Sequence, residues 1–533
     1  MLYIVAKIYG KMNITSIDFF VFLVIFIGIY FTVAARYQWF VLLIASAYFY
    51  WLSSKKASIY ILFTIVSVYL CGLWIGQLNK RQREDINKSP TEKKKIRKKY
   101  KSIKRVCLAV FIIFNLGILL FAKYYNFIGE NISVLSQNIG GDYSFSAKQL
   151  IIPLGISFYT LQAIGYLFDL YRDKMQPESN ILHFALMVSF FPQIVQGPFN
   201  RYKDLKESLF KTHEFRYNRV AFGMQRMLWG IIKKLVIADR LGLLVNPIFS
   251  NYDFYSGTQI FIGSVAYTIQ IYADFSGYMD IMCGLCEILD IKMLKNFNRP
   301  YFSKSVAEFW RRWHITLGAW FREYMFYPIS MSKPANNLSK YARNVFGAKF
   351  GKLCSSYIAL IFVWICTGLW HGANWTYVAW AMVNVVFILT SMQMEDFYTA
   401  CRQRLKIREE AMWWKVFQVS RTFLLVCLMR IFSRANDIHT SIAMYSKLFT
   451  DFRVRELIQI STYKIGIDLY DIVILALFIV LMFNVSMLQR HTSIRKWIAQ
   501  RNLIVRYSIY FGACFSAILF AVTTGGGFLY AVF

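Results

Sequence analysis

Long apolar segments alternate with short polar segments along the chain. Most of them approach or reach the ~17–25 residues with which an α-helix crosses a bilayer. We count roughly twelve, within a range of about 11–13, because short and re-entrant pieces blur such a count. The predicted spans are Phe19 to Ala35, Phe40 to Leu52, Ile59 to Ile75, Val106 to Phe121, Ile181 to Val195, Val220 to Ala238, Gln259 to Leu289, Tyr357 to Trp370, Trp375 to Met392, Trp413 to Ile431, Leu469 to Leu488 and Tyr507 to Thr523. The pattern predicts an all-α, polytopic transmembrane protein.

Composition supports this prediction. Of the 533 residues, 57% are apolar and 17% are charged, whereas a soluble domain carries about 45–50% apolar and about 25% charged residues. The longest polar stretches are short, at residues 77–105, 199–219, 332–352 and 394–410. We therefore expect one integral membrane domain over residues 1–533, in which polar groups inside the membrane carry any chemistry.

The net charge of +32 lies mainly in the segments between the apolar spans. There it indicates membrane topology and contact with lipid headgroups rather than a nucleic-acid partner. The densest run, KKKIRKKYKSIKR at residues 93–105, is predicted to be a cytoplasmic loop, and the alternative is a site for an anionic cofactor or a carrier protein. No small-residue cleavage site follows the first apolar span, which is expected to stay as an anchor.

The nine cysteines are scattered and predict no disulfide framework. Cys283 and Cys286 form a CxxC without a second ligand pair, and they are interpreted as small buried side chains. The sequence contains no zinc-ligand spacing, phosphate-binding loop or GxSxG motif. We therefore expect no metal and no tightly bound cofactor.

Two of the six histidines stand beside tryptophan in polar, aromatic motifs. His371 lies in CTGLWHGANW, residues 366–375, at the end of an apolar span. His314 lies in EFWRRWHITLGAWFREYMFYPI, residues 308–329, which is too charged to cross lipid unaided. We expect that segment to be buried in the protein, where it lines a cavity. The remaining histidines are interpreted as interfacial or solvated: His183, His213, His439 and His491.

Five motifs occur in order over the middle of the chain: PLGISFYTLQ (153–162), FPQIVQGP (191–198), YADFSGYMD (272–280), NFNRPYFSKSVAEFWRRWHITLGAWFREYMFYPI (296–329) and TGLWHGANWTYVAW (367–380). They resemble the membrane-bound O-acyltransferase (MBOAT) family, in the branch of the membrane subunit of bacterial alginate O-acetylation. The resemblance covers core motifs at residues 150–385. It implies spans and buried polar helices around a central catalytic tunnel, with His371 as the catalytic histidine and His314 as its companion.

Acyl transfer from a thioester to a hydroxyl requires the hydroxyl to lose its proton as it attacks. A neutral imidazole suits this task near pH 7, and a general base contributes about 10²–10⁴ in rate. His371 is the predicted base. Trp370 and Trp375 are expected to exclude water, and Asn374 and His314 are candidate donors to the developing oxyanion.

The charged residues before His314 have two interpretations. Arg311 and Arg312 either hold the phosphates of the donor or pair with Glu308. Trp310, which directly precedes the two arginines, is a further candidate for binding the donor.

Two acidic residues stand in an otherwise apolar stretch. Asp274 and Asp280 either orient a catalytic histidine or form hydrogen bonds that pack helices. Gly277 between them indicates local unwinding or a close helix approach.

The tail at residues 524–533 reads TGGGFLYAVF. Its three glycines leave the backbone free to swing or to enter a crevice. Phe528, Tyr530 and Phe533 resemble the aromatic FxYxxF motif of this family, which implies that the phenol of Tyr530 accepts the acyl group as an intermediate. The alternative is a terminal aromatic residue at the membrane interface.

The resemblance implies a bacterial plasma (inner) membrane enzyme that takes an acyl group from acetyl-CoA, or from another acyl-CoA or acyl carrier protein. It would deliver the group for O-acylation of an extracytoplasmic polysaccharide with the help of an extracytoplasmic SGNH-type acyltransferase or esterase. D-alanyl transfer to teichoic acid is an alternative, because residues 330–332, SMS, replace the glycine-rich continuation common in the acetylation branch. A transporter or flippase, with His314 and His371 as proton relays, is the alternative of another class.

Overall fold

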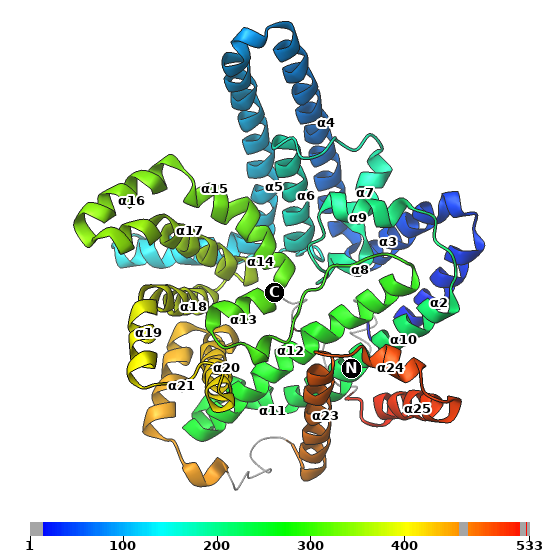
Figure 1. Ribbon diagram of the computed structural model, residues 1–533, viewed down its shortest axis with the longest axis vertical. Helices are drawn as coiled ribbons and strands as arrows, with labels where there is room; N and C mark the ends of the chain where they lie inside the picture. The colour runs from blue at the N-terminus through cyan, green and yellow to red at the C-terminus, as the bar shows by residue number, and fades with distance from the viewer. Residues whose placement is uncertain (1–13, 458–466, 523–528, 530–533) are drawn as a thin grey trace. The chain divides into compact units, whose positions relative to one another are not determined.

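The computed structural model describes residues 14–457, 467–522 and 529. Within these ranges the chain forms helices and no strands (Figure 1). It divides into two compact units, residues 1–223 with 285–294, and residues 224–284 with 295–533. The helices α10 (Tyr217–Ile231) and α12 (Gly257–Ile288) each run from one unit into the other.

The remaining elements are given by unit. The first unit contains α2 (Ile17–Thr32), η1 (Ala35–Tyr37), α3 (Gln38–Ser54), η2 (Lys55–Ala57), α4 (Ser58–Lys88), η3 (Pro90–Glu92), α5 (Lys93–Asn138), α6 (Ile156–Tyr171), α7 (Ile181–Ser189), α8 (Phe191–Ile194) and α9 (Tyr202–Phe210). The second contains η4 (Ile232–Ala238), α11 (Asp239–Ser250), η5 (Tyr252–Phe254), η6 (Pro300–Phe302), α13 (Val306–Arg312), α14 (Ile315–Phe321), η7 (Arg322–Phe326), α15 (Tyr327–Ser330), α16 (Lys333–Phe346), α17 (Ala348–His371), α18 (Trp375–Gln393), α19 (Glu395–Arg404), α20 (Met412–Arg434), α21 (Ile438–Thr450), η8 (Val454–Leu457), α23 (Leu469–Leu488), α24 (Ile494–Ala499) and α25 (Leu503–Leu519).

Six helical stretches in the described ranges are long and apolar enough to cross a membrane. They are Ala35–Lys88, Pro90–Asn138, Ala348–His371, Trp375–Gln393, Met412–Arg434 and Leu469–Leu488. The first stretch contains both α3 and α4, and two shorter apolar helices, α2 and α25, accompany the six. The prediction of an all-α, polytopic membrane protein is confirmed.

Two segments that the sequence predicts to be membrane spans are buried inside the protein. The segment from Ile181 to Val195 divides into α7 and α8, with Phe190 between them in a non-helical conformation, and most of its side chains are inaccessible to solvent. Helix α12 is also largely buried. Both segments pack against protein rather than lipid, which explains how α12 can carry two aspartates.

The basic run at residues 93–105 forms the first turns of α5, so this segment is helical rather than a loop, and its cytoplasmic location stays a prediction. Lysine and arginine are good helix formers, and α4 and α5 run side by side as a long hairpin (Figure 1). Within the hairpin the ammonium of Lys104 donates hydrogen bonds of 2.8 Å to the side-chain oxygens of Asn79 and Gln82. These bonds hold the basic end of α5 against α4.

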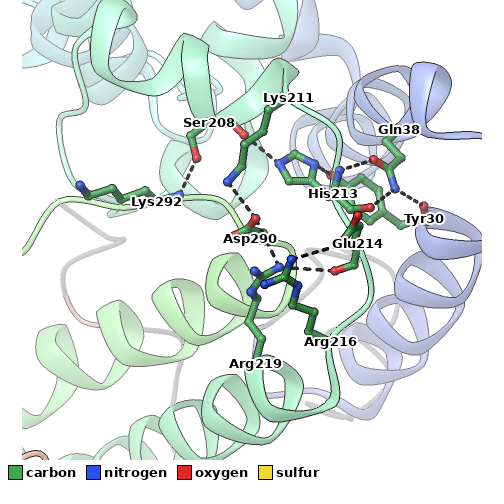
Figure 2. A network of polar contacts seen from close by, with 10 residues as sticks. All are labelled: Tyr30, Gln38, Ser208, Lys211, His213, Glu214, Arg216, Arg219, Asp290 and Lys292. Carbon is green, nitrogen blue, oxygen red and sulfur yellow. Dashed lines mark hydrogen bonds and ion pairs between the residues drawn. The ribbon is translucent and has the colours of Figure 1, made fainter.

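His213 is buried in the first unit, so its interpretation as an interfacial or solvated residue is wrong. Figure 2 shows its partners. Its Nε2 lies 2.9 Å from the carbonyl oxygen of Ser208, and its Nδ1 lies 2.6 Å from the hydroxyl of Tyr30. Because a carbonyl oxygen only accepts, Nε2 is the donor and Nδ1 accepts from the tyrosine. Gln38 accepts the backbone N–H of His213 at 2.9 Å, so the segment before α10 is fixed to α2 and α3.

Helices α10 and α12 approach closely at two glycines of the second unit. A Cβ added to Gly230 would lie 2.5 Å from the carbonyl oxygen of Gly277, and one added to Gly277 would lie 2.9 Å from that of Gly230. Helix α12 continues through Gly277 without a break. Of the two expectations for Gly277, the structure contains the close helix approach.

The nine cysteines all lie in the described ranges, and none of them forms a disulfide. Cys283 and Cys286 are buried in α12, in agreement with their interpretation as small core side chains.

Candidate active site

His371 is the last residue of α17, and α18 packs directly over it. Two glycines make this packing possible: a Cβ on Gly368 would lie 2.7 Å from the carbonyl oxygen of Tyr377, and one on Gly372 would lie 2.2 Å from the Tyr377 ring. His371 is only 5% exposed as a result. Its ring is perpendicular to that of Trp380, with 5.1 Å between centroids.

A small buried cavity of about 10 Å³ lies beside His371. Its other walls come from α12, α18 and α20, of which α18 contacts α17 and α20 in turn (Figure 1). The residues that line it with His371 are Tyr267, Ile271, Tyr377, Trp380, Arg430 and Ser433. A space of this size accommodates about one water molecule. It therefore offers room for one small polar group at the imidazole.

His314 lies between α13 and α14 in a left-handed backbone conformation, with φ of 46° and ψ of 52°. Such a conformation is uncommon outside glycine. The side chain is buried, and its Nδ1 lies 3.1 Å from Oδ1 of Asn296. The same oxygen accepts bonds from the N–H and the hydroxyl of Thr316, at 3.2 and 2.9 Å. Because Oδ1 is an acceptor, Nδ1 donates to it, and in the neutral ring Nε2 then carries the lone pair.

The two histidines share one aromatic neighbour. The ring of Trp370 lies 4.9 Å from His371 and 5.9 Å from His314. On its other side His314 meets the edge of Phe275 from α12, at 4.9 Å. The structure thus brings together the two histidines that the sequence singles out, and it surrounds them with aromatic rings.

Asp274 and Asp280 pair with two lysines of η4, a π-helical segment. Lys234 contacts Asp274 at 2.9 Å and Asp239 at 2.7 Å, while Lys233 contacts Asp280 at 2.6 Å. Both lysines are buried, and buried charges persist where they are paired. Breaks of this kind in the α-helical ladder are frequent at functional sites. These contacts fit the helix-packing interpretation of the two aspartates.

Asp274 also accepts a hydrogen bond from Leu529. The backbone N–H of Leu529 donates to Oδ2 of Asp274 at 3.0 Å. Asp274 follows Ile271, a wall of the His371 cavity, by less than one turn of α12. Tyr530, the next residue after Leu529, lies outside the described residues.

The charged residues before His314 form a local ion pair. Arg312 contacts Glu308 at 2.5 Å, one helical turn away, whereas Arg311 is exposed. The indole N–H of Trp310 donates to Oδ1 of Asn384 at 2.9 Å, and its ring lies 5.4 Å from that of Trp380. Of the two readings, Arg312 therefore fits pairing with Glu308, and Arg311 is accessible to a ligand.

Asn374 and Trp375 do not line the cavity. The side-chain oxygen of Asn374 accepts the N–H of Thr376 and caps α18, while its amide donates to the carbonyl oxygen of Asn436, both at 2.9 Å. Trp375 is 51% exposed. Both residues were predicted to act at His371, whereas the contacts of Asn374 fix the start of α18.

Three known proteins are similar in sequence to half or more of this chain. A probable alginate O-acetylase, AlgI, of Pseudomonas aeruginosa is 31% identical over 438 residues, which cover 82% of this chain and 74% of the relative. The peptidoglycan O-acetyltransferase of Helicobacter pylori is 30% identical and covers 64% of each chain. The teichoic acid D-alanyltransferase of Bacillus subtilis is 28% identical over 52% of this chain and 67% of the relative. This chain is a membrane-bound O-acyltransferase.

The MBOAT family profile matches residues 176–433, a range that includes both histidines and the walls of the cavity. Membership makes the protein an O-acyltransferase and a multi-pass protein of the bacterial inner membrane. The transporter alternative is thereby set aside.

Sequence reasoning missed several charged groups of this MBOAT protein. Lys233 and Lys234 stand inside the predicted span from Val220 to Ala238, and two aspartates stand inside the next one. Opposite charges in consecutive apolar segments were the available signal, because charges inside a membrane protein pair with one another. Arg430 was missed as well, since it stands at the end of a predicted span, where a cation is common.

Proposed function

We propose that this acyltransferase moves an acetyl group from acetyl-CoA, at the cytoplasmic face, toward an extracytoplasmic polysaccharide, with His371 as the general base. The observation that most supports this proposal is the position of His371, whose buried imidazole borders a cavity with room for one small polar group. The names of the similar proteins support acetyl transfer to a polymer.

In the proposed step a hydroxyl oxygen attacks the carbonyl carbon of the thioester while His371 takes the hydroxyl proton. The carbonyl electron pair moves onto oxygen and returns as the carbon–sulfur bond breaks. The leaving thiolate takes the proton from the imidazolium, so an ester and a free thiol result. The aromatic surroundings of His371 support this role, since water near an activated thioester would hydrolyse it.

The first acceptor in this proposal is the phenol of Tyr530. The hydrogen bond from Leu529 to Asp274 supports it, because Leu529 precedes Tyr530 in the chain and Asp274 lies less than one turn of α12 from Ile271, a cavity wall. An extracytoplasmic SGNH-type partner would then pass the acetyl group from the tyrosine ester to the polysaccharide. For the donor, exposed Arg311 is the proposed contact for the phosphates of acetyl-CoA.

Cells that depend on this protein for polymer acetylation provide the first test. We expect His371→Ala to abolish acetyl esters on the surface polymer, measured by mass spectrometry, with unchanged protein in the membrane. His439→Ala is the matched control, because His439 is exposed on α21. Normal ester content in the His371 variant would remove the proposed base.

The similarity to a teichoic acid D-alanyltransferase favours one other donor, a D-alanyl thioester on a carrier protein. Purified protein should be given radiolabelled acetyl-CoA or D-alanyl carrier protein in separate reactions. The proposal predicts label on Tyr530 from acetyl-CoA and none from the D-alanyl donor. The reverse result would replace acetyl with D-alanyl, and label on neither would exclude Tyr530 as the intermediate.

A further inference from the structure

Arg430 is a buried cation near the end of α20, one of the helices long and apolar enough to cross a membrane. Its side chain is only 3% exposed. Moving a guanidinium out of water costs several kcal/mol, even after the protein has relaxed around the charge. A buried charge is therefore retained where another group repays this cost or where function requires it.

The contacts of Arg430 are aromatic. Its guanidinium carbon lies 4.9 Å from the ring centroid of Trp313 and 5.6 Å from that of Trp380. Such cation–π contacts compensate part of the desolvation. In the part of the chain that the structure describes, no carboxylate pairs with the guanidinium, and its Nη2 is buried without a hydrogen-bond partner. The indole N–H of Trp313 is buried without a partner as well.

The other buried lysines and arginines described in the second unit face a carboxylate. Lys233 pairs with Asp280, Lys234 with Asp274 and Asp239, and Arg240 with Asp471. Arg430 departs from this rule. Orphaned buried donors are rare in native proteins, and each calls for an explanation. An orphaned guanidinium donor at Arg430 matches an acceptor oxygen that arrives with a ligand.

Arg430 stands between the two histidine motifs. Trp313, on which its guanidinium lies, directly precedes His314 in the chain. Trp380, its second aromatic neighbour, meets the ring of His371 at 5.1 Å. Arg430 and His371 also border the same small cavity. A group that occupied this cavity would meet a base from α17 and a cation from α20.

We propose that the guanidinium of Arg430 donates a hydrogen bond to the carbonyl oxygen of the acyl group and stabilises the negative charge that develops there. This inference rests on the proposed function, since it concerns the same thioester and the same attack. As the hydroxyl oxygen bonds to the carbonyl carbon, an electron pair moves onto the carbonyl oxygen beside Arg430. It returns to carbon when the bond to sulfur breaks, so Arg430 keeps its proton throughout.

A charge placed in advance in a low-dielectric site stabilises a transition state strongly, and removal of one such donor costs about 10²–10³ in kcat. The test uses purified full-length protein, radiolabelled acetyl-CoA and the steady-state rate of acetyl release or transfer. We expect Arg430→Met to lower kcat by about 10²–10³ with little change in the KM for acetyl-CoA. Arg430→Lys should recover part of the loss, because it keeps the charge but not the forked donor geometry.

A purely structural role for Arg430 predicts a different result. In that case Arg430→Met lowers the melting temperature and the amount of folded protein, while kcat per folded molecule stays normal, which would overturn the inference. Arg434→Met is the matched control: Arg434 lies one turn further along α20, where it bonds Asn246 and lies over Phe249. We expect its kcat to be normal.

His371→Ala in the same assay separates the two proposals. If His371→Ala is inactive while Arg430→Met keeps a normal kcat, the proposed function stands and the role of Arg430 is refuted. If His371→Ala keeps full activity, the proposed function itself fails.

Discussion

The backbone N–H of Leu529 and the carboxylate of Asp274 form a 3.0 Å hydrogen bond that joins the C-terminal segment to the middle of α12. Two further hydrogen bonds connect residues shortly before it, Phe520 and Val522, to the rest of the second unit. The guanidinium of Arg240 donates to the carbonyl oxygen of Phe520 at 2.7 Å, and the N–H of Val522 donates to the carbonyl oxygen of Leu235 at 3.0 Å. Phe520, Val522 and Leu529 each form a hydrogen bond through a backbone group to the rest of the second unit.

Loss of the Asp274 carboxylate should impair acylation of Tyr530. A hydrogen bond to a charged group is worth about 1.5–3 kcal/mol, so Asp274→Ala should lower the initial rate of labelling at Tyr530 by roughly 10–100-fold. Asp280→Ala is the control, because Asp280 is on the same helix and pairs with Lys233. Equal labelling rates per folded molecule in the two variants would show that the Asp274 contact has no role in acyl transfer.

Packing of α18 over His371 should depend on glycine at position 372. A Cβ there would overlap the ring of Tyr377, and such overpacking costs about 1–3 kcal/mol. We expect Gly372→Ala to lower both the melting temperature and the activity. Gly318→Ala is the contrast, because Gly318 lies in α14 with open space around its Cα; alanine there should be neutral or stabilising by up to ~1 kcal/mol. A tolerated Gly372→Ala would contradict the packing described for His371.

The stability of the protein should depend on pH through His213. Burial lowers the pKa of His213 below its ordinary value, near 6.5 in the unfolded chain. The unfolded state therefore binds a proton at a higher pH than the folded state, so stability is full above about pH 6.5 and falls as the pH drops below it. Its charged neighbours in the network are Lys211, Asp290 and Arg219 (Figure 2).

The measurement is the melting temperature in detergent between pH 7.5 and 5.5. Wild-type protein should lose stability over this range, and His213→Gln should show a flatter dependence from a lower starting value. His491→Gln is the control, since His491 is exposed, and it should keep the wild-type slope. An unchanged slope in His213→Gln would assign the pH dependence to other groups.

Arg311 should contribute to donor binding. It is exposed at the end of α13, whereas Arg312 is paired with Glu308. We expect Arg311→Gln to raise the KM for acetyl-CoA roughly tenfold, which corresponds to ~1.4 kcal/mol, with kcat unchanged. Arg343→Gln, at another exposed arginine on α16, should leave KM unchanged. The same KM in both variants would exclude Arg311 as the phosphate contact.

The sequence predicted the class of fold, and its resemblance to the MBOAT family implied that His314 accompanies His371. Apolar segments of bilayer length leave helices as the only arrangement that satisfies the backbone. The two histidines were recognisable because each stands next to a tryptophan in a polar, aromatic motif, and both lie against the ring of Trp370.

Local structure at the basic run and the partners of buried charges were harder to predict. Residues 93–105 read as a loop because of their charge, yet nothing in them breaks a helix, and α5 runs through them. The environment of Arg430 depends on Trp313 and Trp380, which are distant in sequence. Only the packing of α13, α18 and α20 brings them together.

The most direct test of the account measures one turnover of the purified protein. Radiolabelled acetyl-CoA is mixed with an excess of wild-type protein, His371→Gln or His439→Gln, and label on the protein is followed over time. The account predicts wild-type rates for His439→Gln and a fall of about 10²–10⁴ for His371→Gln, the contribution of a general base, at equal melting temperatures. A wild-type rate in folded His371→Gln would contradict the central claim.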